Sequence, residues 1–160
     1  MKSIVPRRIL ILDNIRSAEN VGSLFRTADA VGIETIFLCG ITPSPIDRFG
    51  RPFGKISKTA LGAEKTISWE KVSDTVACLK QLKKQGYQII TIEQSKKSHD
   101  YRKVRVRLPV AFVLGNEVDG VSKNILSLSD NIAEIPMSGR KESLNVAVAG
   151  GIALFRMLGK

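Results

Sequence analysis

Three short segments combine polar side chains with glycines in patterns that suit ligand binding or group transfer. They are residues 14–32, 112–122 and 135–151. The side chains in them that could orient or activate a reacting group are Asn20, Arg26, Glu117, Ser143 and Asn145. These residues supply hydrogen-bond donors, acceptors, a permanent cation and a carboxylate. Such a set suits chemistry that depends on alignment and charge stabilisation rather than on a strong nucleophile.

The sequence lacks the residues needed for a catalytic triad, a metal site, a dinucleotide-binding motif or a phosphate loop. His99 is the only histidine and lies in a polar stretch, so we expect a surface residue rather than a triad or metal ligand. Cys39 and Cys78 stand in apolar surroundings without metal-ligand spacing, which predicts buried free thiols and no metal. No G-x-G-x-x-G follows the first expected strand. Residues 50–56 lack the glycine spacing and the Ser or Thr of a phosphate loop.

Each polar segment also has a purely structural explanation. Asn20 is a good N-cap for the first expected helix, and Arg26 would then be a solvated helix residue. Residues 112–122 fit an ordinary strand, glycine turn and helix, with Ser122 as the helix cap. Considered singly, the first two segments therefore indicate function only weakly.

The spacing of apolar residues along the sequence predicts the strands and helices that hold the three polar segments in place. Buried strands are expected at residues 8–12, 35–38, 88–92, 110–114 and 132–135. Helices are expected at residues 21–31, ended by Gly32, at 72–84, closed by Gly86, and at 143–158, with a long loop at 41–55. Apolar strands separated by helices predict one α/β domain with a mostly parallel sheet and helices on both faces. Its ligands would bind beyond the carboxyl ends of the strands, where the polar segments lie.

The last expected helix is apolar on nearly every face, so we expect it to be buried in the core or against another subunit. Gly150 and Gly151 each weaken it by about 1 kcal/mol relative to alanine. Their presence predicts close approach by a neighbouring element. Core packing does not explain a polar Asn145 at the beginning of such a helix.

The charge of the chain is distributed unevenly. Residues 1–108 hold 20 basic and 10 acidic side chains, whereas residues 109–160 hold five of each, so the whole net charge of +10 lies in the first part. This excess predicts a surface for RNA or DNA. Two basic stretches stand out: residues 48–58, where Arg and Lys alternate with Phe49 and Phe53, and residues 96–107. The second stretch could equally be a solvated charge run.

The N-terminus has no signal-peptide core, and the longest mostly apolar run, residues 146–155, is too short to span a bilayer. We therefore expect a cytoplasmic protein.

Together the three polar segments resemble the signature motifs of the SpoU (TrmH-type) tRNA/rRNA methyltransferases of the SPOUT superfamily. All three occur in order, and the likeness spans nearly the whole chain, including residues 58–64. Ala147 departs from the family pattern, where Ser is common. The resemblance implies an α/β domain with a C-terminal trefoil knot, S-adenosylmethionine as cofactor, and a homodimer with active sites near the subunit interface. Ordinary connection rules disfavour a knot, so only the resemblance predicts it.

The resemblance also implies roles for individual residues. Arg26 would be the catalytic arginine, with Asn20, Glu117, Ser143 and Asn145 in the active site. The cofactor would lie among Ile92, Glu93, Leu114, Gly115, Asn116, Ile135, Met137, Ser143 and Leu144. The expected RNA-binding residues are Arg16, Arg26, Arg48, Arg51, Lys55 and Lys58.

The implied activity is methyl transfer to a ribose 2′-hydroxyl of tRNA or rRNA, with residues 1–160 as a single catalytic domain lacking a separate RNA-binding extension. One alternative is a non-enzymatic RNA-binding protein of the same fold. A more distant alternative is a nucleotide-binding protein of flavodoxin type, which the absent phosphate loop and the third segment oppose.

Overall fold

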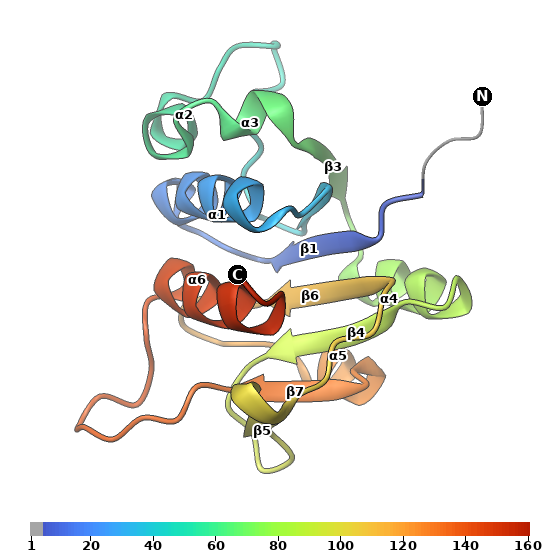
Figure 1. The fold of residues 1–160 in the computed structure, drawn as a ribbon. Helices are drawn as coiled ribbons and strands as arrows, with labels where there is room; N and C mark the ends of the chain where they lie inside the picture. Colours follow the sequence, from blue (N-terminus) through green and yellow to red (C-terminus); the bar gives the residue numbers. More distant parts are fainter. Residues whose placement is uncertain (1–4) are drawn as a thin grey trace.

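The computed structural model describes residues 5–160. The first four residues of the N-terminus, where no signal-peptide core is expected, lie outside the described residues. The described chain forms one seven-stranded sheet in the order β3-β2-β1-β6-β4-β7-β5 (Figure 1). All neighbouring strands in it are parallel. The strands are β1 (Arg8–Asp13), β2 (Thr35–Cys39), β3 (Ser68–Val72), β4 (Gln88–Ile92), β5 (His99–Asp100), β6 (Val110–Leu114) and β7 (Asn131–Glu134). The predicted single α/β domain with a parallel sheet is confirmed.

Helices cover both faces of this sheet, as predicted. They are α1 (Ala18–Val31), α2 (Gly54–Ala60), α3 (Ala63–Thr66), α4 (Thr75–Lys84), α5 (Lys123–Leu128) and α6 (Val146–Met157). Leu10 and Leu12 of β1 point into a core shared with α1, α2, α3 and α6. Ile9 and Ile11 point into the opposite core under α4 and α5. This alternation follows from the two-residue period of a strand, and burial of both faces explains why the central strands are apolar throughout.

The sequence analysis missed β3, α2, α3, the two-residue β5 and the single-turn helix Tyr101–Lys103. Strand β3, with the sequence SWEKV, is an edge strand whose side chains are mostly exposed, so it lacks the apolar run that marks a buried strand. Helix α2 and the four-residue α3 are short, and α2 begins at Gly54, inside the expected loop. The expected helix at 72–84 begins only at Thr75, because Val72 belongs to β3 and Asp74 caps the helix.

Capping residues were predicted with mixed success. Gly32 ends α1 in the left-handed conformation, with φ at 80°, and Ser122 caps α5 as expected. Asn20, however, is not the N-cap of α1. Ser17 holds that position and accepts a hydrogen bond from the amide of Asn20, which frees the Asn20 side chain for other contacts.

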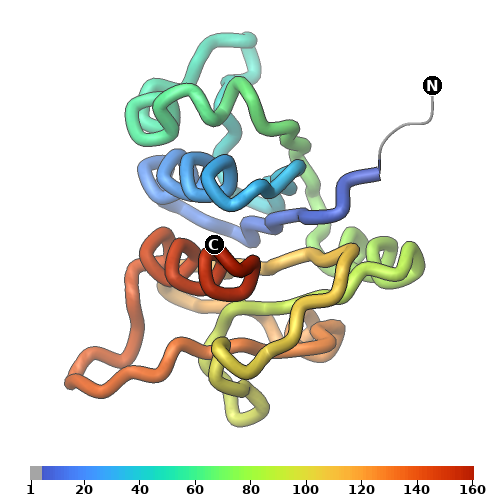
Figure 2. The backbone as a smooth tube through the Cα atoms, viewed as in Figure 1, coloured from blue at the N-terminus to red at the C-terminus, as the bar shows by residue number. Residues whose placement is uncertain are grey.

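Helix α6 is shorter and less buried than expected. It begins at Val146 with Asn145 as its N-cap, so Ser143 and Leu144 lie in the preceding loop. Figure 2 shows that loop, residues 135–145, as a long excursion between β7 and α6. The core of the single chain does not bury this helix completely, because Val148, Ile152 and Phe155 are 50%, 39% and 41% exposed, and burial against another subunit stays a prediction.

The two glycines of α6 differ in their surroundings. A Cβ at Gly150 would lie 2.7 Å from Leu24 Cδ2 and 2.9 Å from Leu114 Cδ1, which confirms close approach there. Apart from its chain neighbours and its own helix backbone, a Cβ at Gly151 would meet no atom of residues 5–160 within 4 Å, so no element of the same chain approaches it closely. Nor is any helix in this described range long and apolar enough to cross a membrane.

Replacement of Gly22 should destabilise the fold. Its Cβ would overlap Thr59 Oγ1 and the carbonyl oxygen of Ile56, so Gly22→Ala must push α1 and α2 apart. We expect a loss of about 1–3 kcal/mol in the free energy of unfolding, measured by urea denaturation. Gly54→Ala, at a glycine of α2 whose added Cβ would meet nothing within 4 Å, is the control and should cost nothing. Equal stability of the two variants would contradict this packing.

Candidate active site

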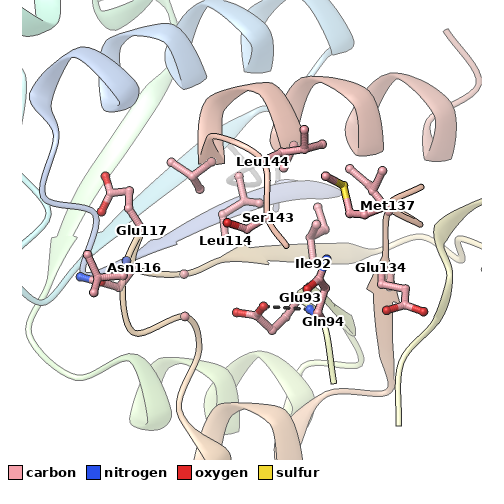
Figure 3. Close-up of a pocket in the computed structure, with 17 residues that line it drawn as sticks. Ile92, Glu93, Gln94, Leu114, Asn116, Glu117, Glu134, Met137, Ser143 and Leu144 are labelled. Atoms are coloured by element: carbon pink, nitrogen blue, oxygen red, sulfur yellow. Dashed lines mark hydrogen bonds between the residues drawn. The ribbon is translucent and has the colours of Figure 1, made fainter. Parts of the chain in front are cut away.

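A pocket opens at the carboxyl ends of β4, β6 and β7, beneath the start of α6 (Figure 3). Its lining comes from the ends of these strands, from the turn after β6 and from the loop before α6. The lining includes every residue expected to hold the cofactor: Ile92, Glu93, Leu114, Gly115, Asn116, Ile135, Met137, Ser143 and Leu144. Because parallel strands end at the same edge of a sheet, segments distant in the sequence meet there.

The pocket is also lined by residues that the sequence analysis did not select. They are Gln94, Glu117, Val118, Gly120, Ala133, Glu134, Val146 and Ala149. Of these, Glu117 was expected in the active site but not in the cofactor pocket. Glu134 could have been recognised, because it is the polar residue that ends an apolar strand. The alanines carry no signal that distinguishes them from core residues.

Glycines let the turn after β6 pass close to the pocket wall. A Cβ at Gly115 would overlap the Val121 side chain, and one at Gly120 would lie 2.5 Å from Glu93 Oε2. Gly120 also has a φ of 67°, which side chains other than glycine rarely adopt. Glu93 Oε2 accepts a hydrogen bond from the amide of Val121 at 3.1 Å, which attaches the turn to the end of β4. The two glycines thus leave the space into which the Val121 and Glu93 side chains pack.

Asn116 anchors the same turn from the other side. Its side chain is largely buried, and Nδ2 donates to the carbonyl oxygen of Asn14 at 2.7 Å. Its Oδ1 accepts from the amides of Val118 and Asp119 at 2.8 and 2.9 Å. Asn116 therefore serves the shape of the turn, with its donor and its acceptor both engaged.

Glu117 connects the second polar segment to the first. Its Oε2 accepts from the amide of Arg16 at 3.0 Å, and its Oε1 accepts from the amide of Ser17 at 3.1 Å. The Asn20 side chain donates to the same Oε1 at 3.3 Å. Partial burial alone would raise the pKa of Glu117. Three backbone amides and Asn20 outweigh that effect, so the pKa lies below its ordinary value.

Asn20 in turn contacts the third segment. Asn145 Nδ2 donates to Asn20 Oδ1 at 3.2 Å, while Asn145 Oδ1 accepts from the amides of Ala147 and Val148 at 2.9 and 3.2 Å. Asn145 thus caps α6 and holds its first turn against the first turn of α1. Three of the five expected active-site residues, one from each segment, therefore form one hydrogen-bonded chain.

The other two expected active-site residues stand apart from this chain. Ser143 is exposed on the pocket wall (Figure 3). Arg26 is exposed on α1, six residues beyond Asn20, which corresponds to a rise of about 9 Å along a helix. Within residues 5–160, neither side chain makes a hydrogen bond, and Arg26 makes no ion pair. The structure therefore brings Ser143 to the pocket but does not bring Arg26 there within one chain.

The residues expected to bind RNA all lie at the surface. Arg16, Arg48, Arg51, Lys55 and Lys58 are exposed, like Arg26. The two phenylalanines among them differ, because Phe49 is 65% exposed while Phe53 packs against the core. Phe53 is therefore not a free stacking surface.

The second basic stretch has the predicted alternation. Val104 and Val106 pack against the core, and Arg105 and Arg107 point outward. Its preceding arginine, Arg102, is paired with Asp100.

The remaining predictions concern single residues. His99 is exposed, as expected. Cys39 is buried and Cys78 partly buried, and both are free thiols. No group of three potential metal-ligating side chains occurs within the part of the chain that the structure describes.

Comparison of the sequence with models of known protein families assigns the chain to one of them. Residues 7–155 match the model of the SpoU rRNA Methylase family. The chain belongs to this family. A tRNA (guanosine(18)-2′-O)-methyltransferase from Aquifex aeolicus is 34% identical over 151 residues, which are 92% of this chain and 66% of that protein. A 23S rRNA (guanosine-2′-O-)-methyltransferase from Neisseria meningitidis is 35% identical over 93% of this chain and 57% of that protein.

Solved structures of SpoU proteins have the same fold. The TrmH/SpoU tRNA modifying enzyme of A. aeolicus superposes with a TM-score of 0.82 at 32% identity, covering 96% of this chain and 77% of that one. An AdoMet-bound rRNA methyltransferase from Sinorhizobium meliloti gives 0.84 at 30% identity, covering 94% and 55%. The chain thus spans about 57–66% of the length of the two SpoU relatives described above.

Neutralising Glu117 should loosen the site in a pH-dependent way. Glu117→Gln replaces a carboxylate that accepts from backbone amides, and we expect a loss of about 1 kcal/mol in unfolding free energy at about pH 7, allowing for its partial exposure. Because the pKa of Glu117 is lowered by folding, its contribution is present above the ordinary value of 4.5 and disappears as pH falls through the folded-state value.

Urea denaturation of both proteins at about pH 7 and about pH 3 measures this difference. The gap between wild type and variant should close at the lower pH. A gap that is absent at neutral pH, or unchanged in acid, would contradict the proposed role of the carboxylate.

Proposed function

We propose that this SpoU protein transfers a methyl group from S-adenosylmethionine to a ribose 2′-hydroxyl of tRNA or rRNA. The observation that carries the proposal is the pocket at the carboxyl ends of β4, β6 and β7, formed by residues of the second and third family motifs. Support comes also from the two relatives, whose names describe 2′-O-methylation of tRNA and 23S rRNA, and from the AdoMet-bound neighbour.

The chemistry of the pocket fits this cofactor. Its apolar walls, which include Ile92, Leu114 and Met137, suit the flat adenine ring. The carboxylates of Glu93 and Glu134 suit a molecule that carries a sulfonium and an ammonium group. When bound, S-adenosylmethionine supplies a methyl group on a positively charged sulfur. Ser143, Leu144 and the neighbouring backbone would hold it in place.

Arg26 would act on the RNA rather than as a base, because a guanidinium with a pKa above about 12 keeps its proton. Its planar fork would grip the phosphate next to the target ribose and stabilise the alkoxide that develops at the 2′-oxygen. The proton would leave through the phosphate or water. Asn20 and Asn145 would orient the ribose and Arg26, and Glu117 would hold Asn20 in place.

We further propose that two copies of the chain pair through α6. Val148, Ile152 and Phe155 recur at helical spacing and form an exposed apolar stripe. Gly151 lies beside this stripe with open space at its Cβ position, which would let a second helix approach. Such a dimer would bury the stripe, and it would let Arg26 of one copy approach the pocket of the other.

The remaining family features are proposed on the same basis. A trefoil knot would form if the segment from residue 135 to the end of α6 passes through a loop made by an earlier part of the chain. The packing of α6 between α1 and the short helix Tyr101–Lys103 supports that path. We propose that the protein acts in the cytoplasm, where tRNA and rRNA are found. That residues 1–160 form one catalytic domain stays a prediction.

The activity can be tested by nucleoside mass spectrometry on host tRNA and rRNA, incubated with the protein and labelled S-adenosylmethionine. We expect a new 2′-O-methyl nucleoside from wild type. Arg26→Ala should reduce its rate of formation at least about a hundredfold, because charge stabilisation in the transition state is lost. Arg26→Lys should be similarly impaired, since lysine lacks the planar fork.

Near-full turnover by Arg26→Lys would contradict the phosphate grip. Cofactor binding without any methylated product would favour the alternative, a non-enzymatic RNA-binding protein of the same fold. Binding of the cofactor is measured separately by calorimetry, so a loss of binding and a loss of turnover are distinguished.

The dimer can be tested by sedimentation equilibrium. Ile152→Asp places a charge in the centre of the stripe, and the variant should sediment as a monomer where wild type is a dimer. Leu61→Asp, at an exposed leucine elsewhere on the surface, is the control and should remain a dimer. A monomeric wild type, or a dimeric Ile152→Asp, would overturn the proposed interface.

A further inference from the structure

The loop after β2 ends in a rigid turn that presents an aromatic ring to solvent. Ile46 and Pro52 form an antiparallel bridge, and the amide of Asp47 donates to the carbonyl oxygen of Arg51 at 2.8 Å. Asp47 Oδ1 accepts from the amides of Phe49 and Arg51 at 2.8 and 3.0 Å. The Arg51 amide is the main cause of a lowered pKa at Asp47, which keeps this carboxylate ionised. The turn is therefore held by its own hydrogen bonds.

Two guanidinium groups lie over the ring of Phe49. Arg48 Cζ is 4.7 Å and Arg51 Cζ is 4.9 Å from the ring centroid, within the range of cation–π attraction. Arg51 Nε is fixed by Asp47 Oδ2 at 2.9 Å, which leaves its terminal nitrogens free to donate. In the described chain, Arg48 makes no ion pair or hydrogen bond. We call the group formed by Arg48, Phe49 and Arg51 the Phe49 tip.

The composition of the Phe49 tip selects its ligand. A ring that is 65% exposed offers a surface for stacking, and the unused guanidinium donors suit a phosphate. Leu61 is equally exposed, but its aliphatic side chain offers neither a flat face for stacking nor a ring for cation–π attraction. The tip thus combines, within one turn, the two groups that bind an unpaired nucleotide: an aromatic face for the base and cations for the backbone.

We propose that the Phe49 tip binds one unpaired nucleotide of the RNA substrate, with the base stacked on Phe49 or its guanidiniums and the phosphate held by Arg48 and Arg51. This inference rests on the proposed function and names the part of the substrate that the tip contacts. In a duplex the bases stack on one another and their faces are covered, so the tip selects single-stranded segments such as loops.

The nucleotide at the tip is not the one that enters the pocket of the same chain. The tip follows β2, which lies three strands from β4 in the sheet, or about 14 Å at the usual strand spacing. Figure 1 shows the connection from β2 to α2 beside α2 and α3, away from the ends of β4 and β7. The tip would therefore contact RNA at a distance from the ribose held in the pocket of the same chain and contribute to the choice of substrate.

Binding of fluorescein-labelled oligouridylate to the full chain, measured by anisotropy without cofactor, tests the proposal. Phe49→Ala should weaken binding about tenfold, the effect of losing one base stack. Phe49→Trp should bind at least as well as wild type, and the introduced indole should lose fluorescence when RNA is added. Leu61→Ala is the control of matched exposure and should bind like wild type. A blunt-ended RNA duplex made of two complementary strands, which has no loop, should bind all four proteins with equal affinity.

Each outcome bears on a different claim. If Phe49→Ala binds oligouridylate within about twofold of the wild-type affinity, the proposed role of the Phe49 tip is overturned. The proposed function is left intact. An equal loss of affinity for the blunt-ended duplex would also overturn it, because stacking on an unpaired base would not be the cause. Wild type that binds neither RNA would count against the proposed function itself. An acidic peptide that displaces the oligonucleotide only when Phe49 is present would assign the tip to a protein partner instead.

Discussion

The hydrogen-bonded chain from Glu117 through Asn20 to Asn145 joins the turn after β6, the first turn of α1 and the first turn of α6. Glu117 and Asn145 also accept from backbone amides that a helix start or turn would otherwise leave unpaired, and Asn20 links these two side chains. The pocket depends on this arrangement, because the turn after β6 forms one wall and the start of α6 forms its cover. The same hydrogen bonds therefore pair the local backbone amides and hold the three segments of the site together.

The parallel sheet explains why this convergence is possible. Strands β4, β6 and β7 all end at one edge, so the segments that follow them must lie near one another even though they are separated by many residues. Glycines in the turn after β6 then allow the turn to pack closely, where a Cβ would collide with the side chain of Val121 or Glu93. The apolar strands provide rigidity, and the polar residues after them provide chemistry.

The surface divides into regions of different character around this centre. The exposed apolar stripe of α6 suits another protein surface, whereas the loop after β2 carries exposed cations and one aromatic ring. Arg26 belongs to neither the pocket nor the hydrogen-bonded chain within one copy of the molecule. Its isolation is explained if the functional unit contains two copies, since α1 packs against α6 and would lie near the same interface.

The sequence alone determined the fold class, the buried strands and the position of the site at the carboxyl ends, because apolar periodicity and the order of polar segments are local signals. It did not reveal β3, whose exposed edge position removes the apolar pattern, or the true cap of α1, since Ser17 and Asn20 are both good capping residues. Only the tertiary structure decided that Asn20 bonds Glu117 and Asn145, that Phe53 is covered while Phe49 is free, and that α6 keeps one face exposed. Those outcomes depend on which elements pack together, and no short stretch of sequence encodes that geometry.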